Sequence, residues 1–208
     1  TRSLCDWSSD VCSSDLFLCP TDSAGPGRYG PTNYRANFGV CWACQFGSVD
    51  GAFSYLAYKL ADFQDGLSNT LAFSEKLIGG VPRGQYRANR DWIMKLPDAG
   101  NLALVTLDGW REHCANLRLE GNEQLVGYTS GRTWVVGTDS MTGFLASVPP
   151  NSSIPDCGGG VTAARSLHPG GVNALMADGS ARFFKSGINA NTWVALATRR
   201  RNDLIGEY

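Results

Sequence analysis

Residues 166–184 read SLHPGGVNALMADGSARFF, and this stretch decides which fold the C-terminal third can adopt. Two largely apolar runs, residues 171–177 and 180–185, are separated by Asp178-Gly179. This pattern is the strongest short-range signal for a β-hairpin, because a type I′ turn needs positive φ at both central residues. We therefore predict an antiparallel hairpin here, closed by a type I′ turn.

The segments around this hairpin predict the other elements of a small sheet. Residues 188–198 indicate a short helix, because Trp193, Leu196 and Ala197 recur at helical spacing and Asn189 or Asn191 can cap it. The arginines at 199–201 would then lie near its C-terminal end. Strands are predicted at 33–39, 70–75, 101–107 and 134–136, and irregular loops at 17–35 and 147–160. The fold class is α+β, with a mostly antiparallel sheet, irregular loops and a short C-terminal helix.

Composition limits the classes of function. The chain has 208 residues, of which 43% are apolar, enough for the core of one domain. Lys plus Arg total 18 and Asp plus Glu total 19, so the chain lacks the basic excess of a nucleic-acid binder. No run approaches the roughly 18 apolar residues of a membrane span. The 25 glycines favour turns and short strands over long helices.

Residues 1–16, TRSLCDWSSDVCSSDL, have neither a helical period nor a clean alternation. Back-translated, they resemble a sequencing adapter read as coding sequence. We exclude them from the fold reasoning, as one does for tags and scars, and treat 17–208 as a single domain. A native signal or anchor would then not be visible in this sequence.

The cysteines leave several hypotheses open. Cys41 and Cys44 form a C-x-x-C, but a zinc site needs two further ligands at a compact spacing. A thioredoxin-like site needs a strand before the motif and a helix after it, and glycines flank it instead. A structural disulfide is favoured over free, metal-binding or redox cysteines. Together with Cys19, Cys114 and Cys157, the count favours an oxidising compartment.

His168 stands before Pro169, Gly170 and Gly171, in a tight bend that leads into the hairpin. An imidazole there is a candidate general base or metal ligand. The favoured interpretation is structural: the ring bonds a carbonyl or carboxylate and fixes the bend. Ser166 and Asp178 lie nearby in sequence, but no G-x-S-x-G elbow supports a hydrolase.

Asp65 and Asp178 are weak candidates for a metal site, because loop carboxylates can bind Ca²⁺ through oxygen. The favoured interpretation is that both residues form turns, Asp65 with Gly66, Ser68 and Asn69, and Asp178 with Gly179. The tryptophans offer a similar choice between a sugar-binding face and core packing. They are Trp42, Trp92, Trp110, Trp134 and Trp193.

Five motifs occur in an order that resembles one bacterial family. His168, nine residues and Asp178-Gly179 match its C-terminal signature. Three earlier segments match its other motifs: 17–22 with Cys19, 33–39 with Asn33, Tyr34, Asn37 and Gly39, and 65–75. Residues 193–199 with Trp193 match its closing motif. The chain is therefore similar to the prepilin-like domain-of-unknown-function family 1559, over residues 17–208 with a poorly matched middle. Residues 200–203 depart from the Gly-Gly-Glu-type ending of that family.

The resemblance implies a non-enzymatic type IV pilin-like or type II secretion pseudopilin-like head domain, exposed in the cell envelope. Full members begin with a prepilin cleavage signal and a long apolar helix, which anchors them in the membrane and joins them to other pilin-like subunits. The resemblance implies neither a cofactor nor a nucleic-acid partner. Calcium at Asp65 or Asp178 is the alternative that the loop carboxylates leave open. A secreted carbohydrate- or calcium-binding module is the alternative function, and a hydrolase using His168 a weaker one.

Overall fold

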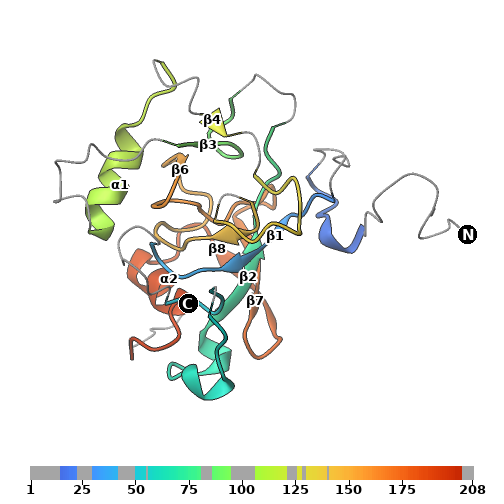
Figure 1. The fold of residues 1–208 in the computed structure, drawn as a ribbon, viewed down its shortest axis with the longest axis vertical. Coiled ribbons are helices and arrows are strands. Elements are labelled where there is room, and N and C mark those ends of the chain that lie inside the picture. Colours follow the sequence, from blue (N-terminus) through green and yellow to red (C-terminus); the bar gives the residue numbers. More distant parts are fainter. Residues whose placement is uncertain are drawn as a thin grey trace, which may run out of the picture.

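The principal element is a five-stranded sheet (Figure 1). The computed structural model describes residues 15–22, 30–41, 50–54, 56–80, 86–94, 106–120, 126–127, 130–139 and 141–202. The strands, in the sheet order β5-β1-β2-β7-β8, are Gly143–Phe144, Tyr34–Asn37, Leu71–Glu75, Gly171–Met176 and Ala181–Lys185. Only the β1–β5 pair among them is parallel. The predicted α+β, mostly antiparallel class is confirmed, and residues 70–75 do form the central strand.

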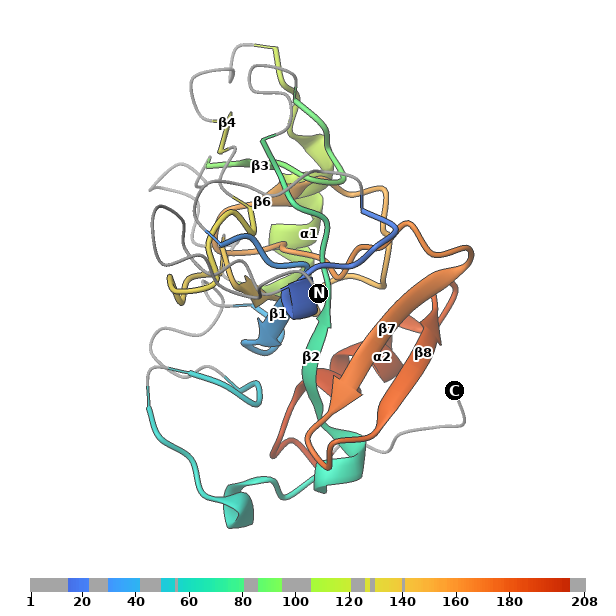
Figure 2. The ribbon, with the colours of Figure 1, turned by 90° about the vertical axis from the view of Figure 1, so that its right-hand side faces the viewer.

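A second, smaller sheet has the order β4-β3-β6. Its strands are β3 (Trp92–Ile93), β4 (Val126–Gly127) and β6 (Asp156–Cys157). The helices are α1 (Leu107–Asn116) and α2 (Ala190–Ala197), with single 3₁₀ turns η1 (Asp15–Phe17), η2 (Leu60–Asp62) and η3 (Leu67–Asn69). The small sheet and α2 lie toward opposite ends of the molecule (Figure 2). In the part of the chain that the structure describes, no helix combines the length and apolar character needed to cross a membrane.

The predicted hairpin is confirmed, but its turn type is not. Strands β7 and β8 pair from Gly171↔Lys185 to Leu175↔Ala181. The connection holds three residues, because the Met176 amide bonds the Ser180 carbonyl and the Gly179 amide bonds back to Met176. Gly179 has φ 88°, whereas Asp178 is not in the positive-φ region. Such a loop needs one left-handed residue, so the expected type I′ turn is replaced by the three-residue form.

The C-terminal helix forms as predicted. The Asn189 side chain caps α2 by accepting hydrogen bonds from the amides of Asn191 and Thr192. Trp193 is buried and packs edge-on against Phe184 of β8, so the helix covers the inner face of the sheet. The arginines at 199–201 lie near the C-terminal end of α2 as predicted, since they directly follow its C-cap Thr198. Arg199 is buried, donates to the Gly51 carbonyl and stacks on the Tyr58 ring instead of completing α2.

One predicted strand is wrong, and another is wrong at its C-terminal end. Residues 106–107 lead into α1 because the Thr106 hydroxyl accepts from the Gly109 amide, an N-cap that begins a helix. The rest of the predicted 101–107 strand lies outside the described residues. Residues 134–136 form no strand and their side chains are largely exposed. In the predicted loop 147–160, two residues form β6 and pair parallel with β3.

The core lies between the large sheet, α2 and α1. A disulfide joins Cys114 of α1 to Cys157 of β6, and both cysteines are fully buried. Cys41 is also disulfide-bonded, whereas Cys19 is free. The structural disulfides favoured from the sequence are therefore present among the described residues, and Cys44 lies outside them. Residues 1–14 of the adapter-like segment also lie outside them.

A buried ion cluster fastens the two sheets together. Lys76, directly after β2, pairs with Asp156 of β6, and both side chains are buried. Arg165 donates to the other Asp156 oxygen from Nε at 3.1 Å and Nη2 at 2.8 Å. Burial alone raises the pKa of Asp156, but Arg165 and Lys76 outweigh it, so the pKa lies below its usual value. Burial lowers the pKa of Lys76 to about 8 despite this partner.

Removing the shared carboxylate should destabilise the fold strongly. We expect Asp156→Ala to lower the free energy of unfolding by about 3–5 kcal/mol, because two buried cations lose their counterion. The matched control is Asp108→Ala, whose carboxylate pairs with Arg111 but is 90% exposed. We expect Asp108→Ala to lower the free energy of unfolding by about 1 kcal/mol or less. Urea unfolding of both variants measures the difference, and similar losses would contradict the role given to Asp156.

The same carboxylate predicts a loss of stability in acid. Its pKa is depressed in the folded state, so its stabilisation is complete above about pH 4, the ordinary aspartate value. That stabilisation is lost as the pH falls through the lower, folded-state pKa. Unfolding free energies measured between pH 5 and pH 2 should therefore fall less steeply for Asp156→Ala than for the unchanged chain. An identical slope would rule out this linkage.

Candidate functional site

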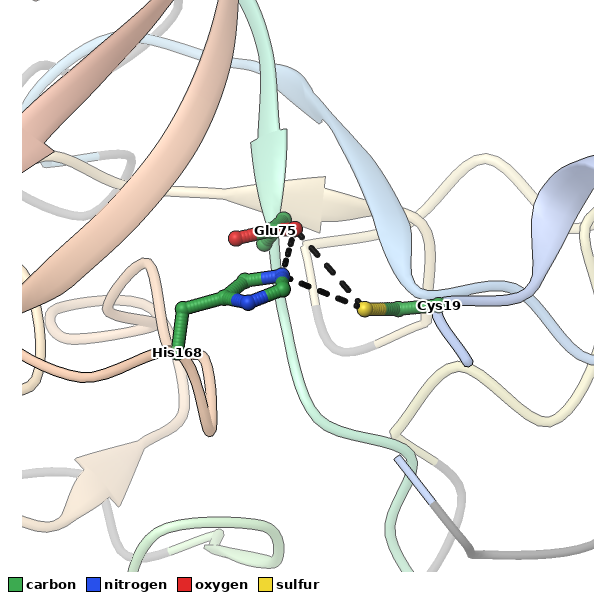
Figure 3. Close-up of side chains that lie close together, drawn as sticks. All are labelled: Cys19, Glu75 and His168. Carbon is green, nitrogen blue, oxygen red and sulfur yellow. Dashed lines mark hydrogen bonds and ion pairs between the residues drawn. The ribbon is translucent and has the colours of Figure 1, made fainter. Parts of the chain in front are cut away.

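Three side chains with ligating atoms meet at the end of β2: Cys19, Glu75 and His168 (Figure 3). His168 Nε2 lies 3.1 Å from Glu75 Oε1 and 3.5 Å from Cys19 Sγ. The Cys19 thiol also reaches Glu75 Oε1, at 3.8 Å. Cys19 and Glu75 are buried and His168 is partly exposed, so the cluster sits just below the surface.

Each of these side chains comes from a different segment. Glu75 is the last residue of β2 and is only 3% exposed. Asn173 of β7 fixes its carboxylate: the backbone amide donates to Oε2 at 2.8 Å and the side chain to Oε1 at 3.2 Å. Cys19 lies just after η1, and its amide donates to Asn33 Oδ1 at 2.9 Å.

The bend that carries His168 has the structural features expected from its sequence. The His168 amide donates to the Ser166 hydroxyl, and Gly170 has φ 84°, a conformation that glycine adopts without steric cost. The ring bonds Glu75, in agreement with the structural interpretation of an imidazole on a carboxylate. Ser166 contacts the His168 backbone, and Asp178 bonds Ser180, so neither joins the ring in a hydrolase arrangement.

The other motif asparagines hold backbone groups. Asn33 donates to Asp22 Oδ2 and to the Lys76 carbonyl, which fixes the segment bearing Cys19 beside β2. Asn37 donates to the carbonyls of Leu71 and Ala197, so it ties β1 to the end of α2. Its own Oδ1 accepts from the amide of Gly39, which has φ 95°. Buried polar groups need such partners, and these residues supply them.

The two aspartate loops lie side by side but do not converge on a ligand position. The amide of Asp178 donates to the Leu67 carbonyl, which brings the 65–70 loop against the hairpin turn. The Asp178 carboxylate accepts from the Ser180 amide and hydroxyl, and these bonds hold its pKa below the usual value. Asp65 accepts from the amides of Arg201 and Asn202. Among the described residues, neither aspartate belongs to a cluster of three ligating groups.

A groove of about 730 Å³ runs over the outer face of the large sheet, opposite α2. Its lining includes Phe17, Tyr34, Phe73, Glu75, Trp134 and Leu175. Phe17 stacks on Trp134 with ring centroids 5.9 Å apart. Burial raises the pKa of Tyr34, and the neighbouring Cys19 and Glu75 raise it further, so its phenol stays protonated at neutral pH. The groove is therefore mostly apolar, with the Glu75 carboxylate at one side.

The described tryptophans do not form a shared sugar-binding face. Trp110 and Trp193 are buried in the core. Trp92 packs closely over Gly127, where a Cβ would lie 2.2 Å from the indole ring. Trp134 is half-exposed and stacks on Phe17 in the groove, and Trp42 lies outside the described residues.

Sequence reasoning named His168 and Cys19 but did not bring them together, and it assigned Glu75 no chemical role. One signal was present: Glu75 ends an otherwise buried central strand, where an acidic residue needs a specific partner. The partners themselves are 56 and 93 residues away in sequence, so no local pattern identifies them.

The fold and the site define an α+β protein in which an N-terminal segment, a central strand and the bend before a C-terminal hairpin share one buried cluster. Comparison with known families gives the same grouping. The chain matches the family described as a protein of unknown function (DUF1559) over residues 5–191, and it therefore belongs to that family. No curated protein and no solved structure matches the chain significantly.

The hydrogen bonds of the aspartate loops predict that calcium has little effect. Because the carboxylates of Asp65 and Asp178 already accept bonds from neighbouring residues, we expect millimolar Ca²⁺ to leave the Tm of the chelator-stripped chain unchanged. A Ca²⁺-dependent rise in Tm that disappears in Asp65→Asn or Asp178→Asn would contradict the interpretation of these residues as turn formers.

Proposed function

We propose that this chain is the envelope-exposed, non-enzymatic head domain of a pilin-like or pseudopilin-like protein. Assembly with other such subunits would proceed through an apolar helix that precedes Phe17 in the full-length protein. The observation that carries this proposal is the apolar outer face of the five-stranded sheet. An antiparallel sheet with one face on the core ordinarily presents polar residues on the other.

The outward-facing positions depart from that rule. On β7 and β8, Leu175 is 37% exposed and Phe183 half-exposed, on the face opposite α2. Tyr34 of β1 and Phe73 of β2 continue the same face across the sheet. A contiguous apolar patch of this kind marks a surface that another element covers.

The position of Phe17 supports an N-terminal occupant. Phe17 of η1 lines the groove. A helix joined to Phe17 would start at the groove and could lie along the sheet without a long connection. Its apolar face would cover Leu175 and Phe73, and its remaining length would be free to enter a membrane or a filament.

The cysteines support an exported domain. Cys114 and Cys157 form a buried disulfide and Cys41 is disulfide-bonded, and such bonds persist in oxidising compartments. The carbohydrate-binding alternative has less support, since the described residues that line the groove include one tryptophan, which is already stacked on Phe17. We therefore favour a periplasmic or cell-surface location.

The coding sequence upstream of Phe17 tests the proposal first. Genomic sequencing of the source should show a G-F-T-L-I-E-like start followed by an apolar helix. A plain signal peptide joined directly to Phe17 would contradict the assembly function and favour a secreted module.

A pair of lysine substitutions tests where that helix lies. In the full-length protein, Leu175→Lys should lower stability by about 1–3 kcal/mol, because the helix would trap a charged group against the sheet. In the 208-residue chain the same variant should change little. Leu56→Lys is the control, since Leu56 is 67% exposed and does not line the groove. Thermal melts that show equal effects of Leu175→Lys in both proteins would contradict the docking.

A further inference from the structure

The arrangement of Cys19, Glu75 and His168 is not that of a nucleophile relay. In a relay, the carboxylate bonds one ring nitrogen of the histidine and the nucleophile bonds the other. Here Glu75 Oε1 and Cys19 Sγ both approach Nε2, at 3.1 and 3.5 Å. The thiol also faces the carboxylate directly, at 3.8 Å. Three donor atoms that face one another in this way surround a common point, as the ligands of a metal ion do (Figure 3).

We propose that Cys19, Glu75 and His168 form a binding site for a zinc-type divalent cation. Zinc–ligand bonds of 2.0–2.3 Å at tetrahedral angles place sulfur about 3.6 Å from nitrogen and from oxygen, and nitrogen about 3.4 Å from oxygen. The corresponding separations in this protein are 3.5, 3.8 and 3.1 Å. A tetrahedral ion therefore fits with shifts of a few tenths of an ångström.

The chemistry of the donors selects the class of ion. Cysteine thiolate and imidazole suit zinc and its neighbours, whereas calcium and magnesium prefer oxygen alone. A thiolate and a carboxylate together carry two negative charges, which balance a divalent cation in a buried position. This site is distinct from the aspartate loops, and it does not depend on the proposed filament assembly.

Outer contacts hold the donors in place. Asn173 donates to both Glu75 oxygens, and the Asn33 side chain accepts from the Cys19 amide. Partners of this kind orient the ligands of metal sites and contribute substantially to affinity. Asn173 is thus a positioning residue that would not itself touch the ion.

Among the described residues the site has three protein ligands, which leaves a fourth position for water or another small ligand. Zinc sites with three protein ligands keep such an open position, whereas structural sites are usually closed by a fourth side chain. His168 is partly exposed, so solvent can reach that side of the cluster.

The experiment titrates Zn²⁺ into the chelator-stripped full chain against a competing chromophoric chelator. Cys5 and Cys12 of the adapter-like segment are replaced by serine in every sample, so that these two thiols do not contribute. We expect one equivalent to bind, with affinity reduced at least about 100-fold by Cys19→Ala or His168→Ala. Asn173→Ala should reduce it about 10- to 100-fold, the range for outer-shell partners. His113→Ala, at the chain's other histidine, should leave it unchanged.

Cobalt gives a second readout that does not depend on these affinities. Co²⁺ bound at the site should show a thiolate-to-metal charge-transfer band that disappears in Cys19→Ser, a conservative variant whose fold is checked by circular dichroism. Absence of stoichiometric Zn²⁺ binding would overturn the proposal. Binding that survives both Cys19→Ala and His168→Ala would overturn it equally, by placing the ion elsewhere.

Discussion

The carboxylate of Glu75 is the contact on which the arrangement of the domain depends. It lies buried at the end of the central strand, where an ionised group is unfavourable unless its oxygens are bonded. Asn173 satisfies it from β7, His168 from the bend before that strand, and Cys19 from the N-terminal segment. One side chain therefore holds together three parts of the chain that local structure would leave independent. The backbone supports the same junction, since the Glu75 carbonyl accepts from the Arg165 amide.

The two faces of the large sheet differ in what they contact. The inner face packs against α2 through Trp193 and Phe184 and belongs to the core, while the buried Lys76–Asp156 pair joins it to the smaller sheet. The outer face is apolar yet exposed, which is the basis for the proposed helix docking. The donor cluster lies at the edge of that face, with Glu75 in the wall of the groove. Assembly and metal binding would thus use adjoining surfaces that meet at Glu75.

Local signals in the sequence were sufficient to predict the hairpin, the central strand and α2. Each of these signals acts over a few residues: Asp178-Gly179, the apolar 70–75 run and the Asn189 cap. The prediction of a type I′ turn was wrong because the loop holds three residues. The register of the two strands sets this length, and the Asp178-Gly179 pair alone does not determine it. Helix α1 was missed because its apolar start resembles a strand and its Thr106 cap was overlooked. The donor cluster joins residues up to 149 positions apart, and only the tertiary fold brings them together.

The most direct test of the central claim is X-ray absorption at the zinc edge. The sample is the full chain loaded with one equivalent of Zn²⁺, with Cys5 and Cys12 replaced by serine. The account predicts one sulfur at about 2.3 Å and nitrogen or oxygen neighbours at about 2.0–2.2 Å, with the sulfur lost in Cys19→Ala. A first shell without sulfur, or an unchanged spectrum for Cys19→Ala, would contradict it.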